Sequence, residues 1–156
     1  MLGKVKLFFG IEGLKVDLDV PDTFNTATTV ISGSLRLHTK SSQVLKKLEV
    51  KLIETYHRGR GKDQRTNDYT WGSIHLEDSV ELKANSEKII DFNLPIKPQY
   101  SSMDKLGNKS VVHRQVSKLA KWLNKTKSEF FIEVSTQVEG TALNPSVKRA
   151  IQFLPQ

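Results

Sequence analysis

Residues 14–20, LKVDLDV, alternate strictly between apolar and charged side chains. Such a period of two is typical of a β-strand with one face buried and the other in water. The proline at position 21 closes the run, since it has no backbone N–H to give to a sheet ladder. The stretch therefore predicts a half-buried strand, with the leucines and valines on its inner face.

The same alternation returns along most of the chain, and turn residues separate the runs. These runs cover residues 31–38, 48–52, 74–82, 90–94, 130–138 and 147–153. The phase shifts at Ile53, and a bulge near Ile53 and Glu54 would accommodate the change. The apolar run at residues 7–9 is expected to be an edge strand or a docked arm. About seven amphipathic strands with short connections predict an all-β, mostly antiparallel sandwich of two layers.

Residues 109–125, KSVVHRQVSKLAKWLNK, break the β-pattern with a helical one. At ~100° per residue the apolar and basic side chains fall on opposite faces. The apolar face is formed by Val112, Val116, Leu119, Ala120 and Leu123, and the basic row by Arg114, Lys118, Lys121 and Lys125. The connection that carries it has ~30 residues, against ~4 to 6 in most compact domains. We expect one domain over residues 1–156 with a helical insertion at about 99–127, its apolar face packed on the sandwich.

Composition narrows the class of protein. A chain of 156 residues with 37% hydrophobic and 26% charged residues can bury one core. The absence of cysteine excludes disulfides, thiolate zinc sites and a cysteine nucleophile. We find neither a signal-peptide pattern nor an apolar run long enough to span a membrane, which favours a cytoplasmic location. The net charge of +7 is concentrated in residues 58–65 and 105–127.

No motif in the chain indicates catalysis. The spacing of His38, His57, His75 and His113 fits no metal site. No serine lies in a nucleophile elbow, and Gly59-Arg60-Gly61-Lys62 lacks the spacing of a phosphate loop. We therefore expect no catalytic residue, no metal and no cofactor, and interpret the chain as a binding protein.

Two basic surfaces are candidate partner-binding sites. The first is the helical row Arg114, Lys118, Lys121 and Lys125 with Trp122 on its flank, which suits an acidic protein face or an anionic membrane. The second is the loop with Arg58, Arg60 and Lys62, where Tyr69 and Trp71 are available for stacking on nucleic-acid bases. Nucleic acid is the weaker alternative because no RNA-binding signature accompanies the loop. Exposed sheet edges offer a further mode, by strand addition of a partner or by pairing of two copies.

Several short strand motifs resemble the arrestin-like superfamily, and in particular the bacterial sporulation-control protein family. They are IEGLKVDL at 11–18, GSLRL at 33–37, FNLP at 92–95 and EVSTQVEG at 133–140. The resemblance implies an immunoglobulin-like sandwich without catalytic activity, which acts in the cytoplasm as a scaffold or regulator through protein contacts. Members of this superfamily usually carry two tandem sandwiches, whereas this chain matches the first, and the helical insertion has no counterpart in the family pattern. A second domain supplied by another chain stays open.

Overall fold

Nine β-strands form the part of the chain that the structure, a computed structural model, describes: residues 2–8, 14–58, 65–98, 127–140, 142 and 144–154, with only the backbone of 2–8, 58 and 127. The strands are β1 (Leu2–Phe8), β2 (Leu14–Pro21), β3 (Thr23–Asn25), β4 (Val30–Thr39), β5 (Gln43–Arg58), β6 (Arg65–Leu82), β7 (Ser86–Pro95), β8 (Lys127–Val138) and β9 (Ser146–Leu154).

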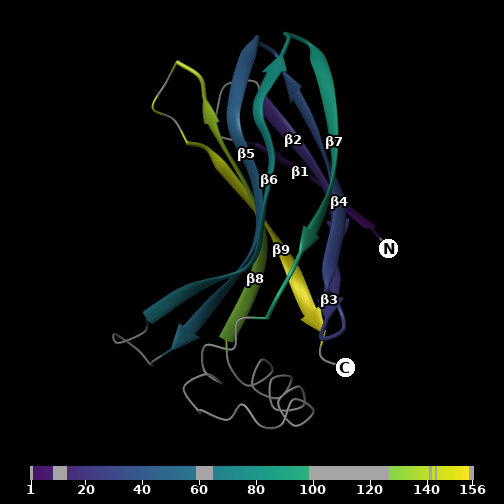
Figure 1. Cartoon of the computed structure of the whole chain (residues 1–156), viewed down its shortest axis with the longest axis vertical. Helices are drawn as coiled ribbons and strands as arrows, with labels where there is room; N and C mark the ends of the chain where they lie inside the picture. Colours follow the sequence, from purple (N-terminus) through teal and green to yellow (C-terminus); the bar gives the residue numbers. More distant parts are fainter. Residues whose placement is uncertain are drawn as a thin grey trace.

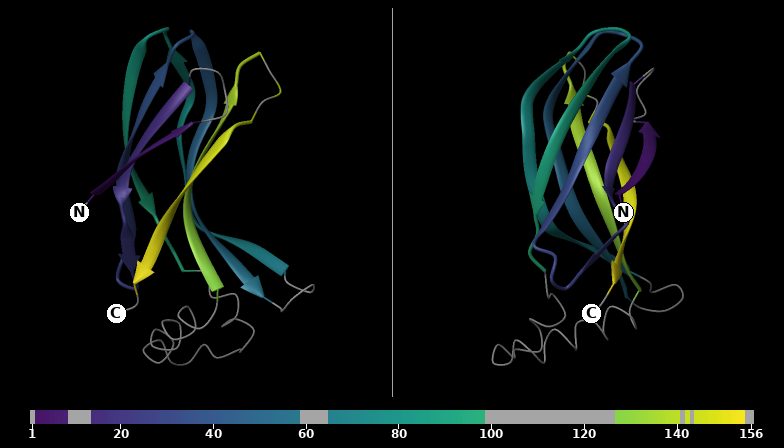
Figure 2. Two further views of the ribbon diagram at one scale, coloured as in Figure 1. Left: turned by 180° about the vertical axis from the view of Figure 1, so that it is seen from behind. Right: turned by 90° about the vertical axis from the view of Figure 1, so that its right-hand side faces the viewer.

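The strands build two sheets packed face to face (Figure 1). Sheet I has the order β1-β2-β4-β7, and sheet II the order β3-β9-β8-β5-β6. Neighbouring strands are antiparallel except for β3 and β9, which run parallel. The chain passes from sheet I to sheet II between β4 and β5 and returns between β6 and β7, at the same end of the sandwich (Figure 2). It also crosses to sheet II between β2 and β3 and returns between β3 and β4. The predicted all-β antiparallel sandwich is confirmed.

The core lies between the sheets and is formed by the apolar side chains that point inward from alternate positions of the strands. On β2, Leu14, Val16, Leu18 and Val20 are all fully buried, as the alternation predicted. Sheet II supplies the fully buried Leu48, Val50 and Leu52 from β5. In the neighbouring strand β8, Ile132 and Val134 are also fully buried and pair with Leu52 and Val50. Because burial of apolar surface is the main favourable contribution to folding, this two-sided apolar interior holds the sheets together.

One glycine is required by the approach of the strands in sheet I. Gly33 lies in the interior of β4, and a Cβ atom there would be 2.6 Å from the Asp19 carbonyl oxygen and 2.6 Å from Val20 Cγ1. It would also lie 2.9 Å from Cζ of Phe92. These distances are shorter than carbon contacts permit, so the packing of β2 and β7 against β4 depends on a residue without a side chain.

The predicted strands are found, including the edge strand expected near the N-terminus, together with one strand that was not predicted. The Leu2–Phe8 strand is the edge strand β1, and β3 is a three-residue strand that the periodicity did not indicate. A register shift between Leu52 and Ile53 confirms the predicted irregularity. The bulged residue is Trp71 on β6, because Leu52 pairs with Gly72 and the next residue, Ile53, pairs with Thr70. The pairing of β5 with β8 continues without a shift at this point.

The predicted helical insertion lies outside the described residues, apart from its last position. Pro98 is the last described residue before the insertion. Lys127 was expected to belong to the insertion, but it is the first residue of β8. Within the described ranges we find no helix with the length and apolar character needed to cross a membrane.

Candidate binding groove

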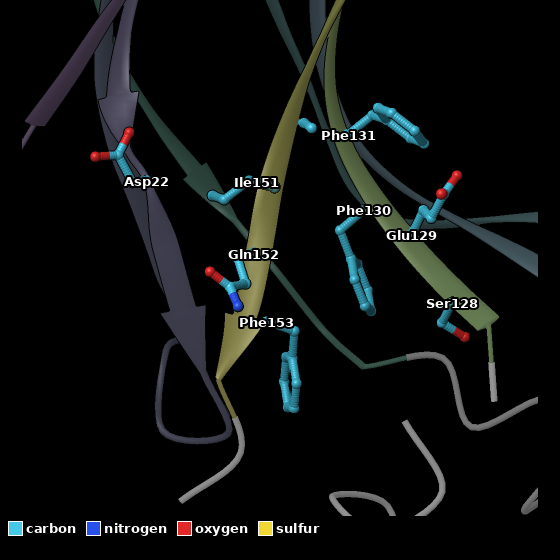
Figure 3. Close-up of a pocket in the computed structure, with 9 residues that line it drawn as sticks. Asp22, Ser128, Glu129, Phe130, Phe131, Ile151, Gln152 and Phe153 are labelled. Carbon is cyan, nitrogen blue, oxygen red and sulfur yellow. The ribbon is translucent and has the colours of Figure 1, made fainter. Parts of the chain in front are cut away.

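Strands β8 and β9 pair over part of their length and then separate. Their last pair toward the open end of the sandwich is Phe130 with Ile151. Beyond it, β8 continues beside β5, where Ser128 pairs with Tyr56. Strand β9 turns toward β3, where Phe153 pairs with Phe24. Figure 3 shows the two strands diverging, and the sheet therefore contains a gap between two strands that each keep a partner on the other side.

A groove with a volume of about 480 Å³ lies at this separation. Since successive side chains of a strand point to opposite faces, the groove collects residues of both parities. Its lining consists of Asp22, Ser128, Glu129, Phe130, Phe131, Ala150, Ile151, Gln152 and Phe153. A second hollow of about 410 Å³ near the β4–β5 and β6–β7 connections has no aromatic residue in its lining. The groove beside β8 is thus the concavity with an aromatic surface.

The aromatic surface belongs to a cluster of four rings at the base of the sandwich. Phe130 and Phe153, from the two diverging strands, have ring centroids 5.8 Å apart in a stacked arrangement and lie side by side in Figure 3. Phe24 meets both rings edge to face at 5.1 Å, and Trp71 meets Phe130 edge to face at 4.9 Å. Offset and edge-to-face pairs of this kind add about 0.5–1.5 kcal/mol each beyond their buried area. The floor of the groove is therefore held from below by Phe24 and Trp71.

A buried carboxyl group lies directly beneath the β8 side of the groove. Glu54 is fully buried on the inner face of β5, opposite Phe130. The indole Nε1 of Trp71 donates to its Oε1 at 3.0 Å, and the Ser128 hydroxyl donates to its Oε2 at 2.8 Å. Burial raises the pKa of Glu54, and the hydrogen bonds from Ser128 and Trp71 offset part of this rise because they stabilise the charged form.

The two ionisable residues of the groove lining are both carboxylates, and each has a partner. Asp22 receives a hydrogen bond from Nη2 of Arg149, whose Nη1 also donates to the Val20 carbonyl at 3.0 Å. Glu129 lies 3.3 Å from Nε2 of His57. Both carboxylates stay more than half exposed, at 57% for Asp22 and 62% for Glu129. The rim therefore presents two exposed carboxylates, each beside a basic side chain.

The residues predicted as partner-binding fall almost entirely outside the described part of the chain. This holds for the helical row of Arg114, Lys118, Lys121 and Lys125, for Trp122, and for Arg60 and Lys62 of the loop. Arg58 is the last residue of β5, and its backbone alone is described. These assignments stay predictions.

Two aromatic residues that the nucleic-acid alternative used have a different role. Trp71 is 3% exposed, and its indole nitrogen donates a hydrogen bond to Glu54. The expectation that it could stack on a base is therefore wrong. Tyr69 packs partly buried against the core.

Two of the described histidines, His57 and His75, lie beside carboxylates. His75 lies 2.7 Å from Asp78 and 3.5 Å from Glu49 on the outer face of sheet II. Within the described ranges no group of three or more histidine, cysteine or acidic side chains is arranged to hold a metal ion.

The groove itself was not among the predicted sites. A local signal existed only for Glu54, which shares the parity of the apolar Leu48, Val50 and Leu52. The structure keeps that parity and buries Glu54, because the extra residue at the register shift is on β6 and not on β5. No local pattern marks where the β8–β9 ladder ends, since that depends on the partners the two strands find in the sheet.

The fold defines a class, the arrestin-like β-sandwiches. A family model described as SpoOM protein matches residues 2–118, and the chain belongs to this Spo0M family of sporulation-control proteins. The crystal structure of Spo0M, sporulation control protein, from Bacillus subtilis superposes with a TM-score of 0.63 at 15% identity. That match covers 92% of this chain and 50% of the other, so the chain spans about half the length of the B. subtilis protein. No curated protein matches the sequence.

Proposed function

We propose that this chain is a non-enzymatic regulatory module that acts in the cytoplasm by binding protein partners. Its membership in the Spo0M family supports a role in regulation. The observation that carries the proposal is the groove between β8 and β9, whose aromatic floor and polar rim resemble the composition of protein-recognition sites.

The chemistry of the groove supports binding over catalysis. A general acid or base needs a titratable group that can reach a substrate with a free lone pair or proton. The carboxylates at the rim are engaged by Arg149 and His57. The buried Glu54 is enclosed by Trp71 and Ser128, so both of its oxygens already accept hydrogen bonds. We infer that these groups stabilise the fold and shape the groove.

A second candidate function is peripheral binding to an anionic membrane through the basic row at residues 114–125. The sequence pattern favours it, because four basic residues share one helical face with a tryptophan at its flank. Nucleic-acid binding through Arg58, Arg60 and Lys62 is weakened, since Trp71 is buried. Pairing of two copies through sheet edges is a further alternative.

The proposal is tested by affinity capture from native lysate with three forms of the protein. These are the wild type, a variant lacking residues 105–127, and A150W, which places a large ring in the groove at an exposed position of β9. We expect specific partners with the wild type. Their loss in A150W alone assigns binding to the groove, and their loss in the deletion alone assigns it to the insertion. Capture of the same proteins by an unrelated β-sandwich of similar charge would contradict the proposal.

A further inference from the structure

The gap in sheet II presents backbone groups as well as side chains. In an antiparallel ladder, the N–H and C=O of one residue point to the same side of the strand, and those of the next residue point to the other. The Thr136 amide donates to the carbonyl of Pro145, at the start of β9, at 3.1 Å. Even-numbered residues of β8 therefore direct their polar backbone groups toward β9, and Ser128 directs them into the gap.

The same reasoning applies to β9. The Gln152 amide donates to the Asp22 carbonyl at 2.9 Å, so the backbone groups of Gln152 point toward β3. Those of its neighbours Ile151 and Phe153 then point toward β8. Ile151 pairs with Phe130, whereas the β8–β9 ladder has ended before Phe153 is reached. The N–H and C=O of Phe153 and of Ser128 consequently face one another across the gap, as strand edges that join no ladder among the described residues.

Strand edges of this kind accept an added strand, provided that side chains next to them fit. Phe153 is partly exposed at the gap, and its ring stacks on the buried Phe130, so it offers an apolar surface for one side chain. On the rim the ionisable side chains are Asp22 and Glu129, and no described lysine or arginine lines the groove. The edge, the floor and the rim together fit an extended peptide with a basic residue beside an apolar one.

We propose that the gap between β8 and β9 binds an extended segment of a partner protein that carries an apolar residue flanked by lysine or arginine. The segment forms backbone hydrogen bonds with Ser128 and Phe153, its apolar side chain packs on the partly exposed Phe153 ring, and its basic residue lies near Glu129. This assignment rests on the proposed protein-binding function. The Ser128 hydroxyl stays with Glu54, so its backbone alone takes part.

The test uses the full chain and a random 12-residue peptide library displayed on phage, followed by synthetic copies of the enriched peptides. We expect enriched sequences with an apolar residue next to lysine or arginine. E129K should weaken their binding at least tenfold, and A150W should abolish it. E139K is the matched control, because Glu139 follows β8 at its other end and pairs with Lys46 at 3.5 Å in a similarly exposed position. We expect less than a twofold change for E139K.

Two further measurements distinguish strand addition from simple apolar contact. In the complex, the amide protons of Ser128 and Phe153 should exchange more slowly with solvent, as measured by NMR. N-methylation of a peptide amide that bonds to Ser128 or to Phe153 should abolish binding, and both parities contain such an amide, because alternate residues of an inserted strand point to β8 and to β9. Binding that tolerates methylation in either parity would indicate side-chain contact alone.

Several results would overturn the proposal. Binding that is equally strong in E129K and A150W would place the peptide elsewhere, and unchanged exchange at Ser128 and Phe153 would exclude strand addition. A dimer of the chain that A150W dissociates in sedimentation experiments would identify a second copy as the occupant. If the library yields no binder while partners are still captured from lysate, the peptide groove is refuted and the protein-binding function stands. Thermal unfolding of both variants confirms that each is folded.

Discussion

Glu54 provides a test of how the base of the sandwich is stabilised. Its carboxyl is fully buried, and burial raises its pKa above the ordinary value of 4.5. The folded chain therefore keeps this proton at pH values where the unfolded chain has released it. Between the two pKa values the folded state binds more protons, so the free energy of unfolding falls as the pH rises. The fall is limited to about 1.4 kcal/mol per pH unit for one group.

E54Q removes this dependence because an amide does not ionise. The amide oxygen can still accept a hydrogen bond from Trp71 Nε1, which lies 3.0 Å from Glu54 Oε1. The amide N–H can donate to the Ser128 hydroxyl, so a hydrogen bond remains at the 2.8 Å contact with its direction reversed. The contribution of Glu54 is fully present below the unfolded pKa of about 4.5 and is lost as the pH rises through the folded pKa. We therefore expect E54Q to gain stability relative to the wild type as the pH increases from 5 to 8.

The measurement is urea unfolding of both proteins at pH 5, 6, 7 and 8, followed by tryptophan fluorescence. The difference between them isolates Glu54, because all other titrating groups are shared. E54A is the companion variant, and it leaves the buried Trp71 N–H and the Ser128 hydroxyl without an acceptor, at a cost of about 1–3 kcal/mol for each buried group. E139Q, at a half-exposed carboxylate, should change stability by less than about 0.5 kcal/mol. A difference between E54Q and wild type that is constant with pH, or that shrinks as the pH rises, refutes the reasoning.

Three further predictions concern the packing and the basic insertion. Gly33→Ala should destabilise the fold by about 1–3 kcal/mol in urea unfolding, since its methyl group would overlap the Asp19 carbonyl. Gly140→Ala has open space but a φ of +82°, so we expect a loss of only about 1 kcal/mol, and equal effects would contradict the clash at Gly33. Phe24→Ala should cost about 3–5 kcal/mol in the same assay because Phe24 contacts three rings of the basal cluster; a cost under about 1 kcal/mol would show that these contacts do not stabilise it. Charge reversal of Lys118 and Lys121 should abolish sedimentation with anionic liposomes at low salt if the basic row binds membranes, whereas unchanged sedimentation removes that alternative.

The strands with a strict period of two were predictable, and the others were not for definable reasons. Residues 14–20 form a strand with one buried face and one face toward water, and the alternation of apolar and charged residues in the sequence predicts this arrangement directly. The beginning of β6, from Arg65, has mostly polar residues and becomes a strand because it pairs with β5. Strand β3 has three residues and one buried side chain, Phe24, which is too short for any periodicity. Its formation depends on its parallel partner β9, which lies more than a hundred residues away in the chain.

The candidate groove shows the same division between local and distant causes. Glu54 could be placed in the interior from its parity with Val50 and Leu52, and a carboxyl group at such a position indicates a site that needs hydrogen-bond donors. The identity of those donors, Trp71 and Ser128, required the register of three strands. The gap itself arises because β9 pairs with β3 while β8 pairs with β5. Nothing in the local sequence around residues 128 and 153 indicates either pairing.

The groove is held open from both sides by polar contacts that lie outside the β8–β9 ladder. On one side, Asp22 accepts from the Gln152 amide and from Arg149, which together hold β9 against β2 and β3. On the other side, the Ser128 hydroxyl donates to Glu54 and keeps β8 on β5. Closing the gap would break one of these sets, and loss of the Ser128 contact would leave Glu54 buried with an unsatisfied oxygen. The carboxyl group that lowers stability near neutral pH is thus also the group that keeps a strand edge available, which is the trade-off expected where a fold preserves a binding surface at some expense of stability.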